Sequence, residues 1–281
     1  MKIKTEREIS LVDLMKEKMG GSITKIKKKI KQQEVFVNGE LITGHNPQIP
    51  AQSVVEFRET KRLLSMNIPI LFEDSDLIAV EKPTGLLSSQ SLKDKDGTVL
   101  GKVNQYLSHK THNKERAFVV HRLDQKVSGV ILFAKSYRIE QELSKNWTKF
   151  EKTYHAAVEG HPAKDSGTLE SWLYEDRNYK VHSSIEQRAD SKLAITHYEI
   201  EKKFRRHSLL SIKLGTGKKN QIRVHLADLG CPIIGDDKYG SNSNPIGRIG
   251  LHAHTLSILH PVSGKALTLH SPSPKSFFNL P

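Results

Sequence analysis

Asp124 stands in a segment whose residue types could carry acid–base or nucleophilic chemistry. It lies in the run HRLDQKVSG at 121–129, directly before the apolar stretch Val130–Ala134. Such a stretch is typical of a buried strand, and an acid ahead of a buried strand can lie at the edge of a cleft. There its carboxylate could act as a nucleophile or a general base. An acid in an ordinary turn is the simpler alternative, and this segment alone favours it.

Arg223 is the second residue whose position calls for a chemical explanation. Ile222, Leu226 and Leu229 have the spacing of one buried helical stripe, and Arg223 lies next to that stripe. Its guanidinium is therefore expected near the protein interior, where an unpaired charge is costly. The sequence thus predicts an anionic partner for Arg223.

Short strand-like runs and a few helices alternate from about Pro69 to the C-terminus. The expected helices are Val99–Leu107, Ile139–Phe150 and Gln221–Leu229. The expected strands include Leu77–Val80, Gly129–Ala134, Tyr154–Val158, Leu193–Ile200 and Ser208–Leu214. Because strands and helices do not alternate regularly, we predict an α+β catalytic domain on a largely antiparallel or mixed sheet with flanking helices.

The N-terminal part has the pattern of a small separate domain. Ser10 and Asp13 are typical of a capped helix that ends at a glycine pair, and Ser22 begins a second helix. Val35–Val37 reads as a strand, and the following Asn38-Gly39 is typical of a hairpin. We predict a helix–helix–hairpin domain over residues 1–60, a linker over 61–68 and the larger domain over 69–281.

The second of these helices carries lysines at high density. They are Lys25, Lys27, Lys28, Lys29 and Lys31. With the hairpin that follows, the run SITKIKKKIKQQEVFVNGE resembles the αL RNA-binding motif known from a small-subunit ribosomal protein, over Ile9 to about Phe57. The resemblance implies that these lysines contact RNA phosphates, and lysine favours such contacts over bidentate recognition. A solvated helix face is the alternative.

Four segments in the larger domain occur in the order typical of a known enzyme family. They are FEDSDLIAVEKPTGLL at 72–87, HRLDQKVSGVILFAK at 121–135, KTYHAAVEG at 152–160 and TGKKNQIRVHLADLGCPIIGDDKYG at 216–240. Together with LHAHTLSILHPVSGKALTLHSPSP at 251–274, they resemble the RluA-type pseudouridine synthases, which isomerise uridine in RNA. An αL module ahead of the catalytic domain is common in that family.

The resemblance implies a catalytic site made of Asp124, Tyr154 and Arg223. Asp124 would act on the ribose, either by attacking C1′ or by removing the C2′ proton. Tyr154 would stack against the turned base and help to remove the C5 proton, and Arg223 would pair with Asp124. The reaction neither oxidises nor transfers a group, so neither a cofactor nor a metal is expected; His252 and His254 are expected to be structural.

The same resemblance suggests cations around the site. A stacked uridine must be flipped out at a cost of a few kcal/mol, which phosphate contacts offset. The candidates for these contacts are Lys82, Arg122, Lys126, Lys135, Lys218 and Lys219. Each of them could also be ordinary surface charge.

Three positions depart from the family pattern. Val127 replaces the usual threonine, Asn220 replaces the usual histidine before Gln221, and Glu81 precedes Lys82 in place of asparagine or aspartate. None of these changes removes the acid, the tyrosine or the arginine. We therefore expect activity to be kept, with the positioning of the sugar or of Asp124 affected.

Charge and composition agree with a nucleic-acid enzyme. Lysine and arginine number 44 against 31 acidic residues, a net charge of +13, which favours a polyanionic partner. Cys231 is the single cysteine, so an intrachain disulfide is excluded. The longest apolar run, Val130–Ala134, is far shorter than the roughly 20 residues that cross a bilayer, and residues 1–20 lack the apolar core of a signal peptide. We expect a cytoplasmic monomer without membrane contact.

The most specific function that follows is a pseudouridine synthase acting on ribosomal RNA of the large subunit. The αL-like module favours ribosomal RNA over transfer RNA. A transfer-RNA enzyme and a non-catalytic RNA-binding or ribosome-assembly factor are the alternatives. A glycosidase is disfavoured, because it would need two carboxylates flanking the sugar, and the resemblance assigns a catalytic role to one acid, Asp124.

Overall fold

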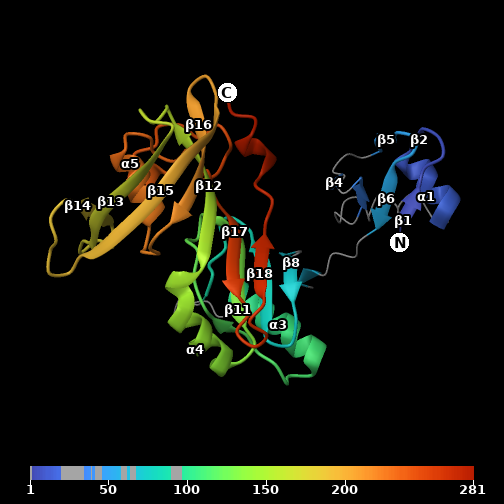
Figure 1. The fold of residues 1–281 in the computed structure, drawn as a ribbon, viewed down its shortest axis with the longest axis horizontal. Helices are drawn as coiled ribbons and strands as arrows, with labels where there is room; N and C mark the ends of the chain where they lie inside the picture. The colour runs from blue at the N-terminus through green and yellow to red at the C-terminus, as the bar shows by residue number, and fades with distance from the viewer. Residues whose placement is uncertain are drawn as a thin grey trace. The chain divides into compact units, whose positions relative to one another are not determined.

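The computed structural model describes residues 2–19, 35–38, 40–41, 46–57, 62–63, 68–89 and 97–281. The chain divides into two compact units, Met1–Arg62 and Leu63–Pro281 (Figure 1). The predicted second helix and its lysines at 25–31 lie outside the described residues. Within those residues, no helix is long and apolar enough to cross a membrane.

The smaller unit contains a four-stranded antiparallel sheet in the order β1-β6-β3-β4, a strand pair β2-β5 and one described helix, α1. Their bounds are β1 (Lys2–Lys4), β2 (Ile9–Ser10), α1 (Leu11–Met19), β3 (Val35–Val37), β4 (Glu40–Leu41), β5 (Gln48–Ile49) and β6 (Val54–Phe57). The predicted helix start is confirmed, because the Asp13 N–H donates to Ser10 Oγ at 3.2 Å. Leu11, Met15 and Val35 are among the residues that form the core of this unit.

The larger unit is built on one long sheet. Its strands are β7 (Arg62–Leu63), β8 (Ile68–Glu73), β9 (Leu77–Lys82), β10 (Phe118–Val119), β11 (Ser128–Ala134), β12 (Glu151–Glu159), β13 (Ser166–Glu175), β14 (Val181–Ser184), β15 (Lys192–Lys203), β16 (His207–Leu214), β17 (Leu251–Leu259) and β18 (Ala266–His270). The order along the sheet is β14-β13-β15-β16-β12-β17-β11-β9-β8-β7, with β10 beside β11 and β18 beside β17.

From β14 to β8, neighbouring strands on this path pair antiparallel except β11 and β17, which run parallel, so the predicted mixed sheet is confirmed. Gly129 lies at this parallel junction opposite Ala253, with φ +118°. A Cβ atom there would lie 2.1 Å from the Ala253 carbonyl oxygen. Only glycine lets the two backbones approach so closely.

Helices cover both faces of the sheet, which explains the unbroken apolar run in β11. Ile131 and Phe133 point into one core with α3 (Val99–Thr111) and α5 (Gln221–Asp228). Val130 and Leu132 point into a second core with α4 (Tyr137–Asn146). In Figure 1, α5 lies beside β14 and β15, and α4 lies beside β11. The three predicted helices are confirmed in position. The last part of the predicted helix Ile139–Phe150 is instead a separate 3-10 turn, Trp147–Lys149.

Candidate active site

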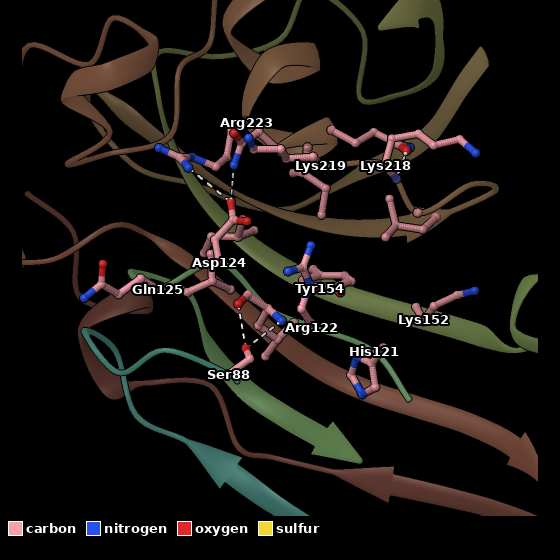
Figure 2. A pocket seen from close by; sticks show the side chains of 18 of the residues that line it. Ser88, His121, Arg122, Asp124, Gln125, Lys152, Tyr154, Lys218, Lys219 and Arg223 are labelled. Carbon is pink, nitrogen blue, oxygen red and sulfur yellow. Dashed lines mark hydrogen bonds and ion pairs between the residues drawn. The ribbon is translucent and has the colours of Figure 1, made fainter. Parts of the chain in front are cut away.

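A pocket of about 540 Å³ opens on the larger unit. Asp124 from a loop, Tyr154 from β12 and Arg223 from α5 all line it, as Figure 2 shows. Asp124 and Arg223 are 99 positions apart in the chain, yet their side chains are hydrogen-bonded. The fold thus brings together the three residues that the sequence selected.

Asp124 lies on the loop between β10 and β11, and backbone contacts hold this loop in place. The Leu123 N–H donates to Ser88 Oγ at 3.0 Å, and the Ser88 hydroxyl donates to the Leu123 carbonyl at 2.7 Å. The Gly85 N–H donates to the Gln125 carbonyl at 2.8 Å. The segment that follows β9 therefore clamps the loop on both sides of Asp124.

Lys82 forms the deepest part of this clamp, and its predicted role in phosphate contact is wrong. The residue is fully buried, at 0% exposure. Its Nζ donates to the carbonyls of Pro83, Gln125 and Val127 at 3.1, 2.9 and 2.5 Å. Burial lowers the pKa of Lys82 to about 7, against the opposing effect of the Asp124 charge. Because the Lys82 Nζ lies beneath the loop that carries Asp124, it supports that loop and does not face solvent.

Arg223 has the anionic partner that the sequence predicted, and it has a second one as well. Its Nε and Nη2 donate to the two carboxylate oxygens of buried Asp236 at 2.6 and 2.7 Å. Its Nη1 donates to Asp124 Oδ2 at 3.1 Å. Burial alone would lower the pKa of Arg223, but Asp236 and then Asp124 raise it. The guanidinium is thus a fixed cation, oriented by Asp236 toward Asp124.

The two carboxylate oxygens of Asp124 have different surroundings. Oδ2 accepts hydrogen bonds from Arg223 Nη1 and from Asn220 Nδ2. No donor to Oδ1 is found in the described part of the chain, and the side chain keeps 31% exposure. The carboxylate is therefore held by one oxygen and presents the other to the pocket.

Tyr154 lies in β12 where the pairing with β17 shifts register, between Thr153 and Tyr154. Burial raises the pKa of the Tyr154 phenol above its usual range, and the nearby Asp124 carboxylate raises it further. The phenol is therefore neutral near pH 7. A neutral phenol offers an aromatic face and an O–H donor, and it is a poor base.

Of the remaining predicted cations, three line the pocket, one pairs with an acid at the surface and one has its side chain in the interior. Arg122, Lys218 and Lys219 line the pocket and are exposed. Lys126 is exposed and pairs with Asp237 at 2.9 Å. The prediction for Lys135 is wrong, because its side chain is 6% exposed and pairs with Glu73 at 3.0 Å and with Glu115 at 3.3 Å.

The family departures are accommodated in different ways. Asn220 takes a left-handed conformation, φ 53°, at the start of α5, and it contacts Asp124 directly. The Val127 side chain is buried, and its carbonyl accepts from Lys82. Burial raises the pKa of Glu81, and the nearby positive charge of Arg248 acts in the opposite direction.

Sequence reasoning missed three features of the site, which are Asp236, the role of Asn220 as a donor to Asp124, and Tyr239. The Tyr239 hydroxyl donates to Asn220 Oδ1 at 3.2 Å. The signal for Asp236 was available, since it is an acid in the segment 216–240 that also contains Arg223.

The histidine and acidic groups outside the pocket have structural partners. His252 Nδ1 lies 2.8 Å from Ser128 Oγ, and burial lowers the pKa of His252 to about 4. Asp74, Asp76 and His260 form the one group with metal-ligand spacing in the described ranges. The Asp74 carboxylate there already accepts from His260 at 2.8 Å and from the Asp76 N–H.

Comparison with known proteins agrees with this geometry. The family model described as RNA pseudouridylate synthase matches residues 76–228. The ribosomal large subunit pseudouridine synthase D of Escherichia coli (strain K12) is 31% identical, over 92% of this chain and 85% of that protein. The uncharacterized RNA pseudouridine synthase YhcT of Bacillus subtilis (strain 168) is 34% identical, over 76% of this chain and 71% of that protein.

Solved structures show the same fold. Human RNA pseudouridylate synthase domain containing 4 matches with a TM-score of 0.62 at 22% identity, over 74% of this chain and 90% of that chain. Human RNA pseudouridylate synthase domain containing 1 matches with a TM-score of 0.61 at 22% identity, over 77% and 86%.

The structure thus places an aspartate that is paired with a buried arginine in a pocket on the mixed sheet of an α+β domain. The chain belongs to the RNA pseudouridylate synthase family. Its activity is the isomerisation of uridine to pseudouridine in RNA.

Proposed function

We propose that this protein isomerises a uridine of large-subunit ribosomal RNA, with Asp124, Tyr154 and Arg223 as its catalytic residues. The observation that carries the proposal is the asymmetric Asp124 carboxylate. Arg223 holds Oδ2 at 3.1 Å while Oδ1 is open to the pocket. A carboxylate held in this way is ready to act on the ribose of a nucleotide that enters the pocket.

The reaction needs three changes within one nucleotide. The bond between N1 and C1′ breaks, the base turns, and a bond forms between C5 and C1′ as C5 gives up its proton to a base and N1 takes one up, so that the nucleotide keeps its composition. Asp124 Oδ1 either attacks C1′, giving an ester that the turned base displaces, or removes the C2′ proton. Arg223 stabilises the Asp124 carboxylate through its fixed charge, and the ion pair is only partly exposed.

Tyr154 serves this reaction best as a contact surface for the base. Its pKa is raised, so a phenolate that could remove the C5 proton would be scarce near neutral pH. The aromatic face requires no ionisation and can stack on either orientation of the uracil ring. We assign Tyr154 to holding the base while it turns.

The choice of ribosomal RNA rests on two supports. Relatives at 31% identity over most of the chain are named ribosomal large subunit pseudouridine synthase D. Residues 1–60 resemble an αL RNA-binding domain, which residues 61–68 connect to the catalytic domain at 69–281. The lysines of that domain, with Arg122, Lys218 and Lys219 at the pocket and the exposed Lys126 on the Asp124 loop, would neutralise phosphates around the target.

Chemical mapping of pseudouridine in cellular RNA tests the proposal. We expect cells without the gene to lose one or a few sites in large-subunit RNA, and wild-type protein to restore them. Asp124→Asn should not restore them, because an amide neither attacks C1′ nor accepts the C2′ proton. Asp190→Asn is the matched control, since Asp190 is an exposed acid that does not line the pocket.

Other outcomes would redirect the assignment. Loss confined to transfer RNA would keep the chemistry and replace the substrate. Full restoration by Asp124→Asn, with the sites present, would contradict the catalytic role of Asp124. An unchanged pattern in both RNA pools would favour the non-catalytic RNA-binding factor.

A further inference from the structure

Tyr179 is a large aromatic residue in a place where the fold gives it no packing role. It lies in the turn between β13 and β14, has φ +60° and keeps 74% exposure. A residue other than glycine rarely takes this left-handed conformation, and asparagine or glycine is far better suited to it. The chain therefore places a tyrosine where the backbone favours another residue.

The turn is held by Asp176 and does not depend on the tyrosine ring. Asp176 Oδ1 accepts from the backbone N–H groups of Asn178 at 2.8 Å and Lys180 at 2.9 Å. The Tyr179 N–H donates to the Asp176 carbonyl at 3.0 Å. Because these bonds use backbone groups at positions 178–180, the conformation of the turn does not require the tyrosine ring.

This turn lies at the edge of the catalytic pocket. Lys219 lines the pocket, and its Nζ is 5.7 Å from the centroid of the Tyr179 ring. Lys238 Nζ donates to the Tyr179 carbonyl at 3.1 Å. The neighbouring Asp237 pairs with Lys126, which follows Asp124 on the catalytic loop. The ring thus lies next to Lys219 of the pocket lining, and the backbone of its turn is tied to Lys238.

The chemistry of this edge fits a nucleic acid strand. Lys238 is exposed and offers an ammonium group to a phosphate, whereas Lys219 is ion-paired with Glu175 beside the Tyr179 ring. Tyr179 itself is 74% exposed and offers an aromatic face to a base. Aromatic rings interleaved with cations are the usual surface for unpaired RNA, because every base has a stackable face. A uridine that flips into the pocket leaves a neighbouring base without its stacking partner.

We propose that Tyr179 stacks on a base that flanks the target uridine and so stabilises the RNA with that uridine flipped out. This inference rests on the proposed function, since it assumes that RNA occupies the pocket. It adds a binding residue outside the pocket, which affects affinity for RNA and leaves the chemical step to Asp124, Tyr154 and Arg223.

Direct RNA binding in an inactive background tests the role of Tyr179. The Kd for a large-subunit ribosomal RNA transcript would be measured for Asp124→Asn alone and with Tyr179→Asn or Tyr179→Phe. Asparagine suits the left-handed turn and removes the ring, whereas phenylalanine keeps the ring. We expect Tyr179→Asn to raise Kd by about 5- to 100-fold, as for the loss of one base–aromatic stack, and Tyr179→Phe to leave Kd unchanged.

Tyr137→Asn is the matched control, because Tyr137 is 63% exposed and does not line the pocket; its Kd should equal that of the parent. An unchanged Kd for Tyr179→Asn would overturn the inference, and so would an equal loss with Tyr179→Phe, which would assign the effect to the hydroxyl. Failure of the proposed function is seen separately, as absence of pseudouridine formation by the wild-type protein, and does not alter this comparison of Kd values.

Discussion

At the scale of single residues, the orientation of Asn220 follows from a chain of hydrogen bonds. The Val181 N–H donates to the Tyr239 oxygen at 3.2 Å, so the Tyr239 hydroxyl hydrogen is available to Asn220 Oδ1. An amide whose oxygen accepts from Tyr239 must direct its NH₂ group to the other side, where Asp124 Oδ2 lies. Asn220 stands where the family pattern has a histidine, and its amide donates to Asp124 Oδ2. This contact leaves Asp124 Oδ1 free.

Removing this donor should slow the chemical step. We expect Asn220→Ala to lower the single-turnover rate constant by about 10- to 100-fold, the usual value of a hydrogen bond to a charged group, with RNA affinity unchanged. Tyr239→Phe should have a smaller effect in the same direction, because the amide stays but loses its orienting partner. Asn220→His should recover most of the rate. A wild-type rate constant for Asn220→Ala would contradict a positioning role.

Residue types were sufficient to select three residues that share one pocket but not to place the lysines. Asp124, Tyr154 and Arg223 line one pocket as expected. Lys82 and Lys135 were predicted to contact phosphates beside the cleft, but Lys82 is buried and the side chain of Lys135 is 6% exposed. The burial of a lysine side chain depends on acceptors that come from distant parts of the chain. The sequence did carry a signal that Lys82 is buried, because Lys82 is the last residue of the run LIAVEK, which begins with four apolar residues and forms β9.

At the scale of elements, periodicity predicted those that bury an apolar face. The strands β9, β11 and β16 and the helix α5 were expected close to their observed bounds. β1 (Lys2–Lys4) and β13 (Ser166–Glu175) were not among the predictions, because their residues are largely polar or half-exposed. β6, which pairs with β1, lies far along the chain, and β15, which pairs with β13, lies across a loop. Neither pairing gives a local signal in the sequence.

Gly129 shows how one element junction supports the site. It joins the catalytic loop to β11 and approaches Ala253 of β17 so closely that no side chain fits. We expect Gly129→Ala to lower the free energy of unfolding by more than about 4 kcal/mol, because backbone strain and a clash with a carbonyl act together. Denaturant unfolding of the purified variant measures this.

The control for Gly129→Ala is a glycine with similar backbone geometry and open space. Gly264 has φ +67° and nothing within 4 Å of an added Cβ. Gly264→Ala should therefore cost only the conformational strain, about 1–2 kcal/mol. Equal losses for the two variants would show that the approach of β11 to β17 does not require glycine.

At the scale of the whole molecule, two groups of cations are expected to serve different ends. Arg122, Lys218 and Lys219 line the pocket of the larger unit, where they would act on the nucleotides next to the target. The lysines at 25–31 belong to the N-terminal region that resembles an αL motif. Two RNA-binding parts on one chain raise the effective concentration of each for its own site, so we expect the N-terminal lysines to contribute to affinity and not to the chemical step.

Neutralising these lysines in the full-length chain tests that division. Each phosphate contact releases counterions, so log K falls with log salt in proportion to the number of contacts. We expect replacement of the five lysines at 25, 27, 28, 29 and 31 by glutamine to weaken binding to large-subunit RNA and to flatten its salt dependence, with the single-turnover rate constant at saturating protein unchanged. The control replaces five exposed lysines of the larger unit that do not line the pocket, Lys114, Lys145, Lys164, Lys192 and Lys265. If both variants keep the wild-type salt slope, the N-terminal lysines do not touch RNA, and the affinity must come from the cations of the larger unit.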